Sequence, residues 1–441
     1  MSIQSQTKIF NWDNFDKSPE IERIKSILDS LPDEELLIVL KRERKKKRDD
    51  YPVTALWRSL VVGMICGHFT IAALIRELKR NAELRQICGF DDIKGDRSVP
   101  PDYVYSRFCD KLDSHWELIE KMFNDLLRDV AELLPDFGRD LAIDSKAIPV
   151  PGKKCVDADT GTKQYENADG TFTKLTWFGY KLHLIVDALY ELPIGFKVTA
   201  ASAADSPQLM PMIEEVKEKQ PKIIENTERA SLDKAYDSAK IKAELYDDFG
   251  IIPLIPPRNM LANKEDPIRP LDPTRSDTIY KGPTGEIYCK CHPFETDPEK
   301  MFVLMQFQGF EKKRNTLKFR CPAMAFGAKC NNREACQCNP RVRDGKFGRI
   351  VRVHIDLDRR VFLPQHVHSQ GFKEQYKKRT SVERVNYRLD HVHGFENTRL
   401  RSLKAVRMRV GISLLVMLAS ARSWIHAGKV ENIRSILSAA A

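Results

Sequence analysis

The chain has 441 residues, of which 42% are hydrophobic and 30% are charged, enough to bury the cores of about two or three domains. Lys and Arg number 72 against 62 Asp and Glu, a net +10, and the region 341–412 alone carries a net +11 (18 basic and 7 acidic side chains), so the positive surplus of the protein is concentrated there. The longest apolar runs, 60–75 and 410–421, are shorter than the roughly 18 to 20 residues that cross a bilayer, and the N-terminus lacks a secretory pattern, so we expect a cytoplasmic protein with no membrane contact.

The first part of the chain is predicted to be helical. From about residue 18 to 135 the apolar residues recur at helical spacing, and breakers such as Pro52 and Gly95 lie between the runs. We therefore expect an all-helical N-terminal DNA-binding domain over 1–135. A basic tract within it is either a solvated helix end or a phosphate-binding segment, and consists of Lys41, Arg42, Arg44, Lys45, Lys46, Lys47 and Arg48.

After residue 138 the sequence pattern changes to one that predicts alternating strands and helices. The pattern predicts strands at 140–150, 178–188, 192–202, 228–238 and 251–255. The second and third of these should form an antiparallel hairpin, and Asp205 should cap a helix that runs to about Lys219. A further helix is expected over 238–249. Strands followed by strand–helix–strand units indicate an α/β fold with a mixed sheet flanked by helices.

Regular structure is expected to fade after residue 258. Nine of the 24 prolines lie between Pro253 and Pro298, and six of the ten cysteines lie between Cys289 and Cys338. We interpret 259–349 as a Cys/Pro-rich insertion that divides the catalytic domain into 138–258 and 350–428. Helical spacing returns near residue 370 and continues, with a break at 391–394, to about 427.

Two acidic residues lie among apolar strand residues. Asp144 stands in LAIDSK and Asp233 in ASLDKAYDS, and a buried carboxylate needs a partner because an unpaired buried charge costs several kcal/mol. Each could pair with a neighbouring Lys or Arg or cap a strand end. The alternative is a divalent cation, since carboxylate oxygens are ligands for Mg²⁺ and a pair of ions about 3.5–4 Å apart supports phosphodiester chemistry.

A third acid lies in the helix predicted near 371–390. At about 100° per residue, Tyr376, Arg379 and Glu383 fall within about 60° of one helix face. Arg379 could hold the Glu383 carboxylate or contact a phosphate. An ordinary surface Glu–Arg pair would have the same spacing.

The combination of these segments resembles bacterial insertion-sequence transposases of the DDE class. The resemblance covers about residues 35–425 and rests on VPPDYVYSRFCDKL (99–112), LAIDSKAIPV (141–150), FGYKLHLIVDA (178–188), LDKAYDS (232–238) and the Tyr376, Arg379, Glu383 spacing. It implies an N-terminal helical transposase domain and a ribonuclease-H-like catalytic domain. It also implies that Asp144, Asp233 and Glu383 bind two Mg²⁺ or Mn²⁺ ions, with Tyr376 and Arg379 in supporting positions.

Two departures from the family pattern bear on the supporting residues. Related transposases place a lysine where this chain has Asp390, so a phosphate contact could pass to Arg388. Some relatives have a tryptophan soon after the second acid, whereas Tyr236 is the nearby aromatic here, so a hairpin intermediate is not implied. His183 is either a packed strand histidine or a further contact to the site or to DNA.

The resemblance also implies the reaction and the partners. Hydrolysis at the ends of a mobile element would free a 3′-hydroxyl, which then attacks target DNA in line. The partner is double-stranded DNA, as terminal inverted repeats and target, bound by a dimer in the nucleoid. Its phosphates would meet the basic tract at 41–48 and the region 341–412, including Lys377 and Lys378. Two alternatives are a non-catalytic zinc-bearing DNA-binding protein and a stand-alone nuclease of the same fold.

The cysteines of the insertion are candidate zinc ligands. Ten cysteines in a reducing compartment are thiols or metal ligands rather than disulfides, and C-x-C pairs are tighter than the usual zinc pairing. Zinc, free thiols and an iron–sulfur cluster are all compatible with the spacing. His292 could replace one ligand, and the cysteines concerned are Cys289, Cys291, Cys321, Cys330, Cys336 and Cys338.

Overall fold

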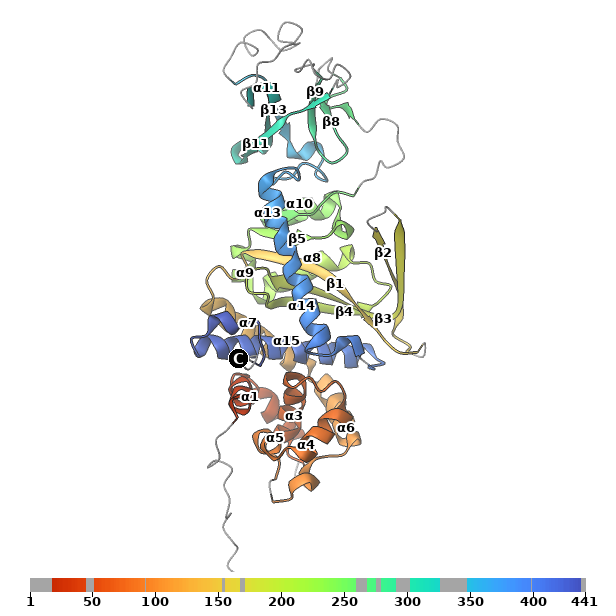
Figure 1. The fold of residues 1–441 in the computed structure, drawn as a ribbon, viewed down its shortest axis with the longest axis vertical. Coiled ribbons are helices and arrows are strands. Elements are labelled where there is room, and N and C mark those ends of the chain that lie inside the picture. Colours follow the sequence, from red (N-terminus) through yellow and green to blue (C-terminus); the bar gives the residue numbers. More distant parts are fainter. Residues whose placement is uncertain are drawn as a thin grey trace, which may run out of the picture.

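The computed structural model describes residues 18–44, 51–91, 93–152, 155–166, 171–258, 268–274, 279–290, 302–325, 347–397 and 399–437. Along its longest axis the described chain has N-terminal helices at one end, a central sheet with its covering helices, and two small sheets at the other end (Figure 1).

The N-terminal segment is helical, as the sequence predicts. Side-chain caps define two of the starts, because Thr70 accepts a hydrogen bond from the Ala73 N–H and Asn81 accepts one from the Leu84 N–H. The helices are α1 (Pro19–Asp29), α2 (Glu34–Arg44), α3 (Val53–Ile65), α4 (Ile71–Arg80), α5 (Ala82–Cys88), α6 (Asp102–Asp113) and α7 (Trp116–Leu133).

The central sheet is mixed and has six strands, in the order β2-β3-β1-β5-β6, with β4 also paired to β3. The pairs of β3 with β1, β2 and β4 are antiparallel, whereas β1–β5 and β5–β6 are parallel. The expected hairpin of the second and third predicted strands is confirmed by the β3–β4 pair. The strands are β1 (Asp140–Pro149), β2 (Asp159–Glu166), β3 (Phe172–Asp187), β4 (Pro193–Ala200), β5 (Arg229–Leu232) and β6 (Ile252–Leu254).

Three details of the central sheet differ from the prediction. Strand β2 and the first part of β3 were not predicted, because their polar residues lack the apolar alternation of a half-buried strand. The strand expected over 228–238 ends at Leu232, since the Asp233 carboxylate accepts a hydrogen bond from the Ala235 N–H and starts a 3₁₀ turn, Lys234–Tyr236. Asp205 makes no side-chain cap at α8; its carboxylate lies 3.0 Å from Lys181 Nζ instead.

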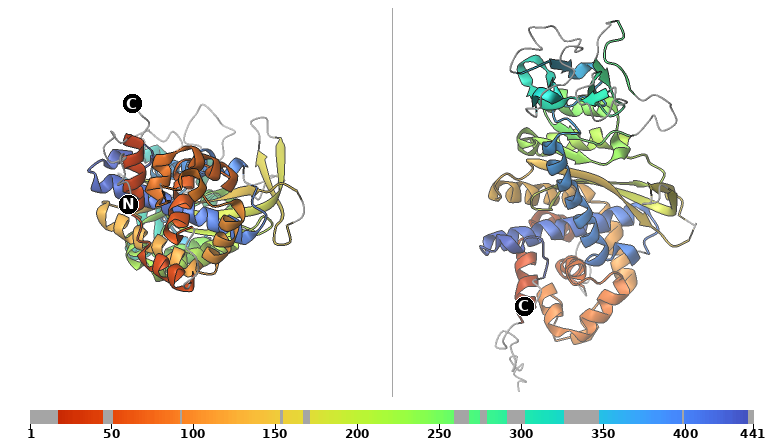
Figure 2. Two further views of the ribbon diagram at one scale, coloured as in Figure 1. Left: turned by 90° about the horizontal axis from the view of Figure 1, so that it is seen from below. Right: turned by 45° about the horizontal axis from the view of Figure 1, so that its top comes forward.

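Helices cover the sheet and join it to the N-terminal helices. Helix α14 packs on β1 and β3, while α15 lies between the sheet and the N-terminal helices, packing on β4, α7, α1 and α3 (Figures 1 and 2). The break predicted at 391–394 separates α14 from α15. These helices are α8 (Ser206–Lys219), α9 (Pro221–Asn226), α10 (Ala239–Asp247), α13 (Gln370–Tyr376), α14 (Thr380–His391) and α15 (Leu403–His426).

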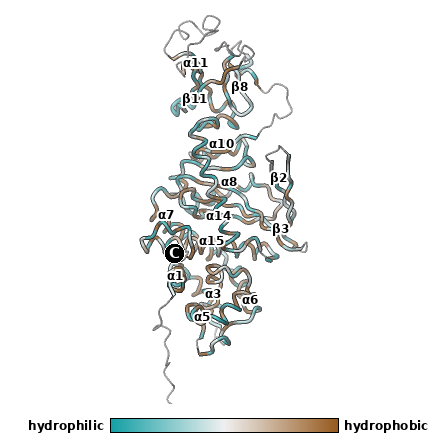
Figure 3. The backbone as a smooth tube through the Cα atoms, viewed as in Figure 1, coloured by the Kyte–Doolittle hydropathy of each residue, from teal (hydrophilic) through white to brown (hydrophobic). Residues whose placement is uncertain are grey.

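One hydrophobic core runs through both regions. It extends from Ile24 in α1 through Trp57 in α3 and Leu415 in α15 to Ile185 in β3, all buried. Hydrophobic segments accordingly occur in the N-terminal helices and in the central sheet alike (Figure 3). The N-terminal helices therefore share a core with the sheet.

The insertion contains regular structure, contrary to our expectation. Strand β12 reads TLKFR, and its alternate residues Leu317 and Phe319 are buried in a second core with Ile279, Ile287 and Phe362. Proline and cysteine content obscured this alternation. A four-stranded sheet comprises β7 (Arg269–Pro270), β8 (Ile279–Lys281), β9 (Ile287–Lys290) and β10 (Phe302–Leu304), and a three-stranded sheet comprises β11 (Gln306–Glu311), β12 (Thr316–Arg320) and β13 (Ile350–His354).

Strand β13 lies beyond the boundary that we drew at 349/350. It pairs with β12 through Ile350–Arg320 to His354–Thr316, so these residues belong to the small sheet and not to the six-stranded one. Within the described part of the chain, no helix combines the length and apolarity that a bilayer crossing requires.

Candidate active site

The first two candidate acids lie side by side on neighbouring parallel strands. Ile143 of β1 is in register with Leu232 of β5, and Asp144 and Asp233 are the next residues along the two strands. Neighbouring strands are roughly 4.8 Å apart, and residues in register point to the same face. Strand β5 ends at this point whereas β1 continues, so the sheet opens next to Asp144.

Burial governs the charge of Asp144. Asp144 is only 7% exposed, and its Oδ1 accepts a hydrogen bond of 2.8 Å from the Ser145 N–H. Burial raises the pKa of Asp144 to about 6, an effect that the nearby Lys163 opposes and the charge of Asp233 reinforces. The two carboxylates are therefore close enough to repel each other.

The third acid, Glu383, is tied to this pair through an arginine. Arg379 Nη2 donates a 2.5 Å hydrogen bond to Glu383 Oε1, and Arg379 Nη1 lies 3.6 Å from Asp144 Oδ2. The Arg379 guanidinium also lies 5.9 Å from the ring centre of Tyr376. The predicted common face of these three residues is thus confirmed, although a 3₁₀ turn, Lys377–Arg379, separates α13 from α14.

The charges of all three acids also act on the pKa of the Tyr376 hydroxyl. Burial raises its pKa and Arg379 lowers it, while the charges of Asp233, Asp144 and Glu383 raise it further. The three candidate acids, which are far apart in the sequence, therefore face one neighbourhood.

The carboxylates are not arranged as a ready-made metal cage. Among the described residues, no group of three or more His, Cys, Asp or Glu side chains is placed to hold a metal ion. A guanidinium, itself a cation, contacts Asp144 and Glu383. Carboxylate oxygens are the ligands that Mg²⁺ and Mn²⁺ prefer, so the donor set fits a divalent ion once Arg379 moves aside.

Ion pairs fasten helix α14 and the turn before it along strand β1. Lys378 Nζ lies 2.6 Å from Asp140 Oδ2, and Arg229 Nε lies 2.6 Å from Asp140 Oδ1. Further along, Lys146 of β1 pairs with Asp390 of α14. Asp390, which stands where relatives have a lysine, thus binds a lysine that comes from β1. Lys378, expected at DNA, is engaged with Asp140, whereas Lys377 is exposed.

Two other candidate residues are enclosed by protein contacts. Arg388 donates from Nη1 to the Arg434 carbonyl at 3.0 Å and from Nη2 to the Glu191 carbonyl, so a phosphate contact would require these bonds to break. His183 is 1% exposed; its Nε2 lies 3.0 Å from Thr199 Oγ1 and its Nδ1 3.7 Å from Asp205. Burial lowers the pKa of His183 to about 4.

Some candidates are only partly covered by the structure. Lys41 and Arg42 are exposed at the end of α2, and Arg44 donates to the Tyr51 carbonyl, whereas Lys45, Lys46, Lys47 and Arg48 lie outside the described residues. Cys289 is buried in β9 and Cys321 follows β12. The remaining cysteine candidates and His292 lie outside the described residues, namely Cys291, Cys330, Cys336 and Cys338.

Sequence reasoning missed two groups near the acids. Lys163 acts on Asp144 from β2, a strand that was not predicted. Asp205, interpreted as a cap, pairs with Lys181 and adds to the raised pKa of the buried Tyr236 hydroxyl. Tyr236 is 1% exposed, so its ring is enclosed in the core.

Comparison with known proteins gives one match. A family model described as a transposase DDE domain matches residues 135–419, more than half of the chain and the span that holds all three acids. No curated protein and no solved structure matches the chain. The matched span starts at the end of the N-terminal helices and ends within α15, so it covers the whole central sheet. The chain belongs to the transposase DDE-domain family.

Proposed function

We propose that this protein is an insertion-sequence transposase that cleaves DNA at the ends of a mobile element and joins the freed ends to target DNA. The observation that carries the proposal is the register of β1 and β5, which makes Asp144 and Asp233 neighbours while Arg379 links Asp144 to Glu383. Family membership supports a transposase in general. The positions of the three acids support placing the chemistry at this end of β1 and β5.

We further propose that the catalytic domain is ribonuclease-H-like. In chain order, β1, β3 and β4 are joined antiparallel, and β5 and β6 follow as parallel neighbours of β1. Helix α14, which carries Glu383, packs across β1 and β3. This order supports a mixed sheet in which the acids come from two adjacent strands and one covering helix, interrupted by the insertion.

The proposed chemistry uses Asp144, Asp233 and Glu383 as ligands. Two Mg²⁺ or Mn²⁺ ions held there would lower the pKa of the attacking hydroxyl or water and stabilise charge on the transferring phosphate. The three carboxylates would hold the positive charge of the two ions in a fixed position. Arg379, released from Glu383, would be one turn away from the ligand and able to contact a phosphate oxygen.

DNA would approach the open side of α14. Lys377 and Arg384 are exposed there, together with Tyr387, which is 62% exposed. Lys41 and Arg42 offer further positive charge on the N-terminal helices. Binding should therefore weaken steeply with salt, because phosphate contacts release condensed counterions. Joining two ends needs two active sites, so we propose a dimer on DNA.

Nicking of end DNA with Mg²⁺ or Mn²⁺ tests the proposal. The substrate is a duplex that carries the sequence flanking the gene, and the variants are Asp233→Asn and Glu383→Gln, with exposed Asp248→Asn as the matched control. Both site variants should lose at least about 100-fold in nicking while keeping DNA affinity. Cleavage without strand transfer would indicate a nuclease, and DNA binding without nicking by the wild type would indicate the non-catalytic alternative.

A further inference from the structure

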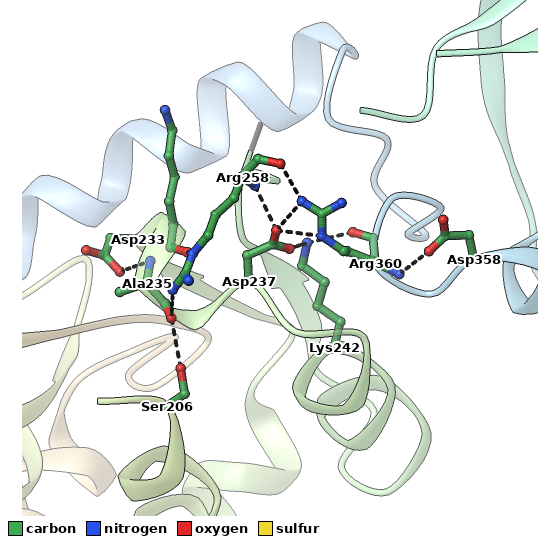
Figure 4. A network of polar contacts seen from close by, with 9 residues as sticks. Ser206, Asp233, Ala235, Asp237, Lys242, Arg258, Asp358 and Arg360 are labelled. Carbon is green, nitrogen blue, oxygen red and sulfur yellow. Dashed lines mark hydrogen bonds and ion pairs between the residues drawn. The ribbon is translucent and has the colours of Figure 1, made fainter. Parts of the chain in front are cut away.

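A buried ion pair lies four residues beyond Asp233. Asp237 and Lys242 have side chains with 0% exposure, and Asp237 Oδ1 accepts a 2.6 Å hydrogen bond from Lys242 Nζ (Figure 4). The other carboxylate oxygen accepts from the Arg258 N–H at 2.7 Å and from Arg360 Nε at 2.8 Å. One carboxylate therefore binds three cationic residues, two through their side chains and Arg258 through its backbone.

These two arginines mark the connections to the insertion. Arg258 ends the segment that follows β6, and Arg360 comes after β13 on the return. The two connections also bind each other, since Arg360 Nη2 donates to the Arg258 carbonyl, and Lys242 Nζ donates to the Arg360 carbonyl at 2.6 Å. We call Asp237, Lys242, Arg258 and Arg360 the neck.

The neck reaches the turn that carries Asp233. Arg258 Nε donates to the Lys234 carbonyl at 2.6 Å, and Arg258 Nη2 donates to the Ala235 carbonyl. Ser206 Oγ donates to the same Ala235 carbonyl at 2.8 Å (Figure 4). The Ala235 N–H in turn donates to Asp233 Oδ1 at 2.7 Å. Arg258 therefore binds both peptide groups of the turn, and the first of them, between Lys234 and Ala235, also supplies the N–H that binds the Asp233 carboxylate.

We propose that Arg258 is a positioning residue for Asp233, and that through it the neck fastens the insertion to the turn that carries this acid. The proposal rests on the metal-binding role proposed above for Asp233. Partners behind a metal ligand fix its orientation, and their loss typically lowers metal affinity or activity about 10- to 100-fold. This role was not predictable from the sequence, because Arg258 is 25 residues beyond Asp233 in a proline-rich segment.

The contacts separate positioning from general stability. The Arg258 side chain is exposed, and it binds the turn only through its guanidinium. Its backbone N–H, which binds Asp237, remains in Arg258→Ala. That variant thus keeps the buried Asp237–Lys242 pair and the Arg360 contacts. It removes the hydrogen bonds from the guanidinium to the carbonyls of Lys234 and Ala235.

The experiment compares Arg258→Ala and Arg258→Lys with Arg359→Ala in the full chain. Arg359 is a suitable control because it makes as many side-chain contacts, to Asp247 and Asp356, without reaching the turn. Three measurements are made: Mn²⁺ binding by calorimetry without DNA, the Mn²⁺ concentration for half-maximal nicking, and hydrogen exchange of the peptide covering 233–238.

We expect Arg258→Ala to raise both Mn²⁺ midpoints about tenfold and to speed exchange of the turn, with Arg258→Lys in between and Arg359→Ala at the wild-type values. Thermal unfolding checks that the variants fold. Arg258→Ala values equal to those of Arg359→Ala would overturn the proposal while leaving the function intact. If Asp233→Asn binds Mn²⁺ and nicks like the wild type, the proposed function itself fails, and the positioning role with it.

Discussion

Arg379 Nη1 lies 3.6 Å from Asp144 Oδ2, a carboxylate whose pKa burial raises to about 6. The same guanidinium binds Glu383. One side-chain cation thus contacts two of the three proposed ligands, and its single charge offsets part of theirs. Binding of a divalent ion has to displace it, and the displaced group is then free for another anion.

Replacing Arg379 should therefore separate metal binding from catalysis. In Arg379→Ala, Mn²⁺ should bind about 10- to 30-fold more tightly without DNA, because a positive charge about 4 Å away costs an incoming divalent cation about 2 kcal/mol even at the dielectric constant of water. Nicking should nevertheless fall. Calorimetry with Mn²⁺ measures the first effect, with Arg384→Ala, which pairs with Glu191, as control. Weaker Mn²⁺ binding by Arg379→Ala would contradict this account.

The raised pKa of Asp144 predicts a pH-dependent cost to stability. The folded pKa of about 6 exceeds the ordinary value of an aspartate, 3.8, so the folded state holds the proton more tightly and stability falls as pH rises from about 4 to 6. Asp144→Asn removes this cost. With chelator present, it should gain on the order of 2 kcal/mol more relative to wild type at pH 7.5 than at pH 4.5 in urea unfolding.

The control for this prediction is Asp248→Asn, which removes an exposed carboxyl group at the end of α10. Added Mn²⁺ should stabilise the wild type and not Asp144→Asn, because an ion that binds only the folded state shifts the unfolding equilibrium. An equal gain for Asp144→Asn at both pH values would show that burial does not perturb this carboxyl.

Periodicity predicted most of the central fold. Helical spacing predicted the N-terminal helices and α14, because each of these helices buries one face. Short apolar runs predicted β1, β4 and β6, because these strands are buried on one face or on both. Strand β2 was missed because it pairs with β3 at the edge of the sheet and its described residues are largely exposed. The insertion strands were missed because they are short and lie in a segment whose proline and cysteine content obscured their alternation.

The candidate site was predictable as residue types but not as contacts. An acid among apolar strand residues marks Asp144 and Asp233, and helical spacing places Arg379 beside Glu383. Which cation would meet Asp144 depends on how α14 packs across β1, and a single sequence does not give that packing. The hydrogen bonds from Arg258 to the turn after Asp233 were likewise not predictable, because they depend on the path that the chain takes after β6.

Placing a lysine at position 390 should destabilise this protein. Lys146 and Asp390 are 13% and 19% exposed, and Asp390→Lys would place two lysines together. We expect a loss of about 2–4 kcal/mol in the free energy of unfolding, by the cost of breaking a largely buried pair. Adding Lys146→Glu should recover part of it, which a double-mutant cycle measures. Wild-type stability in Asp390→Lys would refute the importance of the pair.

The cysteines of the insertion should hold one zinc ion per chain. Cys289 is 5% exposed in β9 and belongs to the second hydrophobic core, so a packed thiol is the competing interpretation. Metal analysis of the purified protein should find about one equivalent of zinc. Cys289→Ser should lower it, whereas Cys66→Ser, a thiol in the helical region, should not. Iron in place of zinc would favour the cluster alternative, and absence of both would favour free thiols.

The shared core predicts that the N-terminal helices cannot be removed without loss of the fold. Trp116 of α7 packs edge-on against Phe196 of β4, and Arg23 of α1 lies 3.7 Å from the ring centre of Trp424 in α15. A fragment of residues 136–441 would expose the apolar surface of α15, which lies between the two regions. Expressed alone, it should aggregate; co-expressed with 1–135, it should be recovered as a complex with the cooperative unfolding of the intact chain. A soluble, cooperatively unfolding 136–441 fragment would show instead that the sheet and its helices form an independent domain.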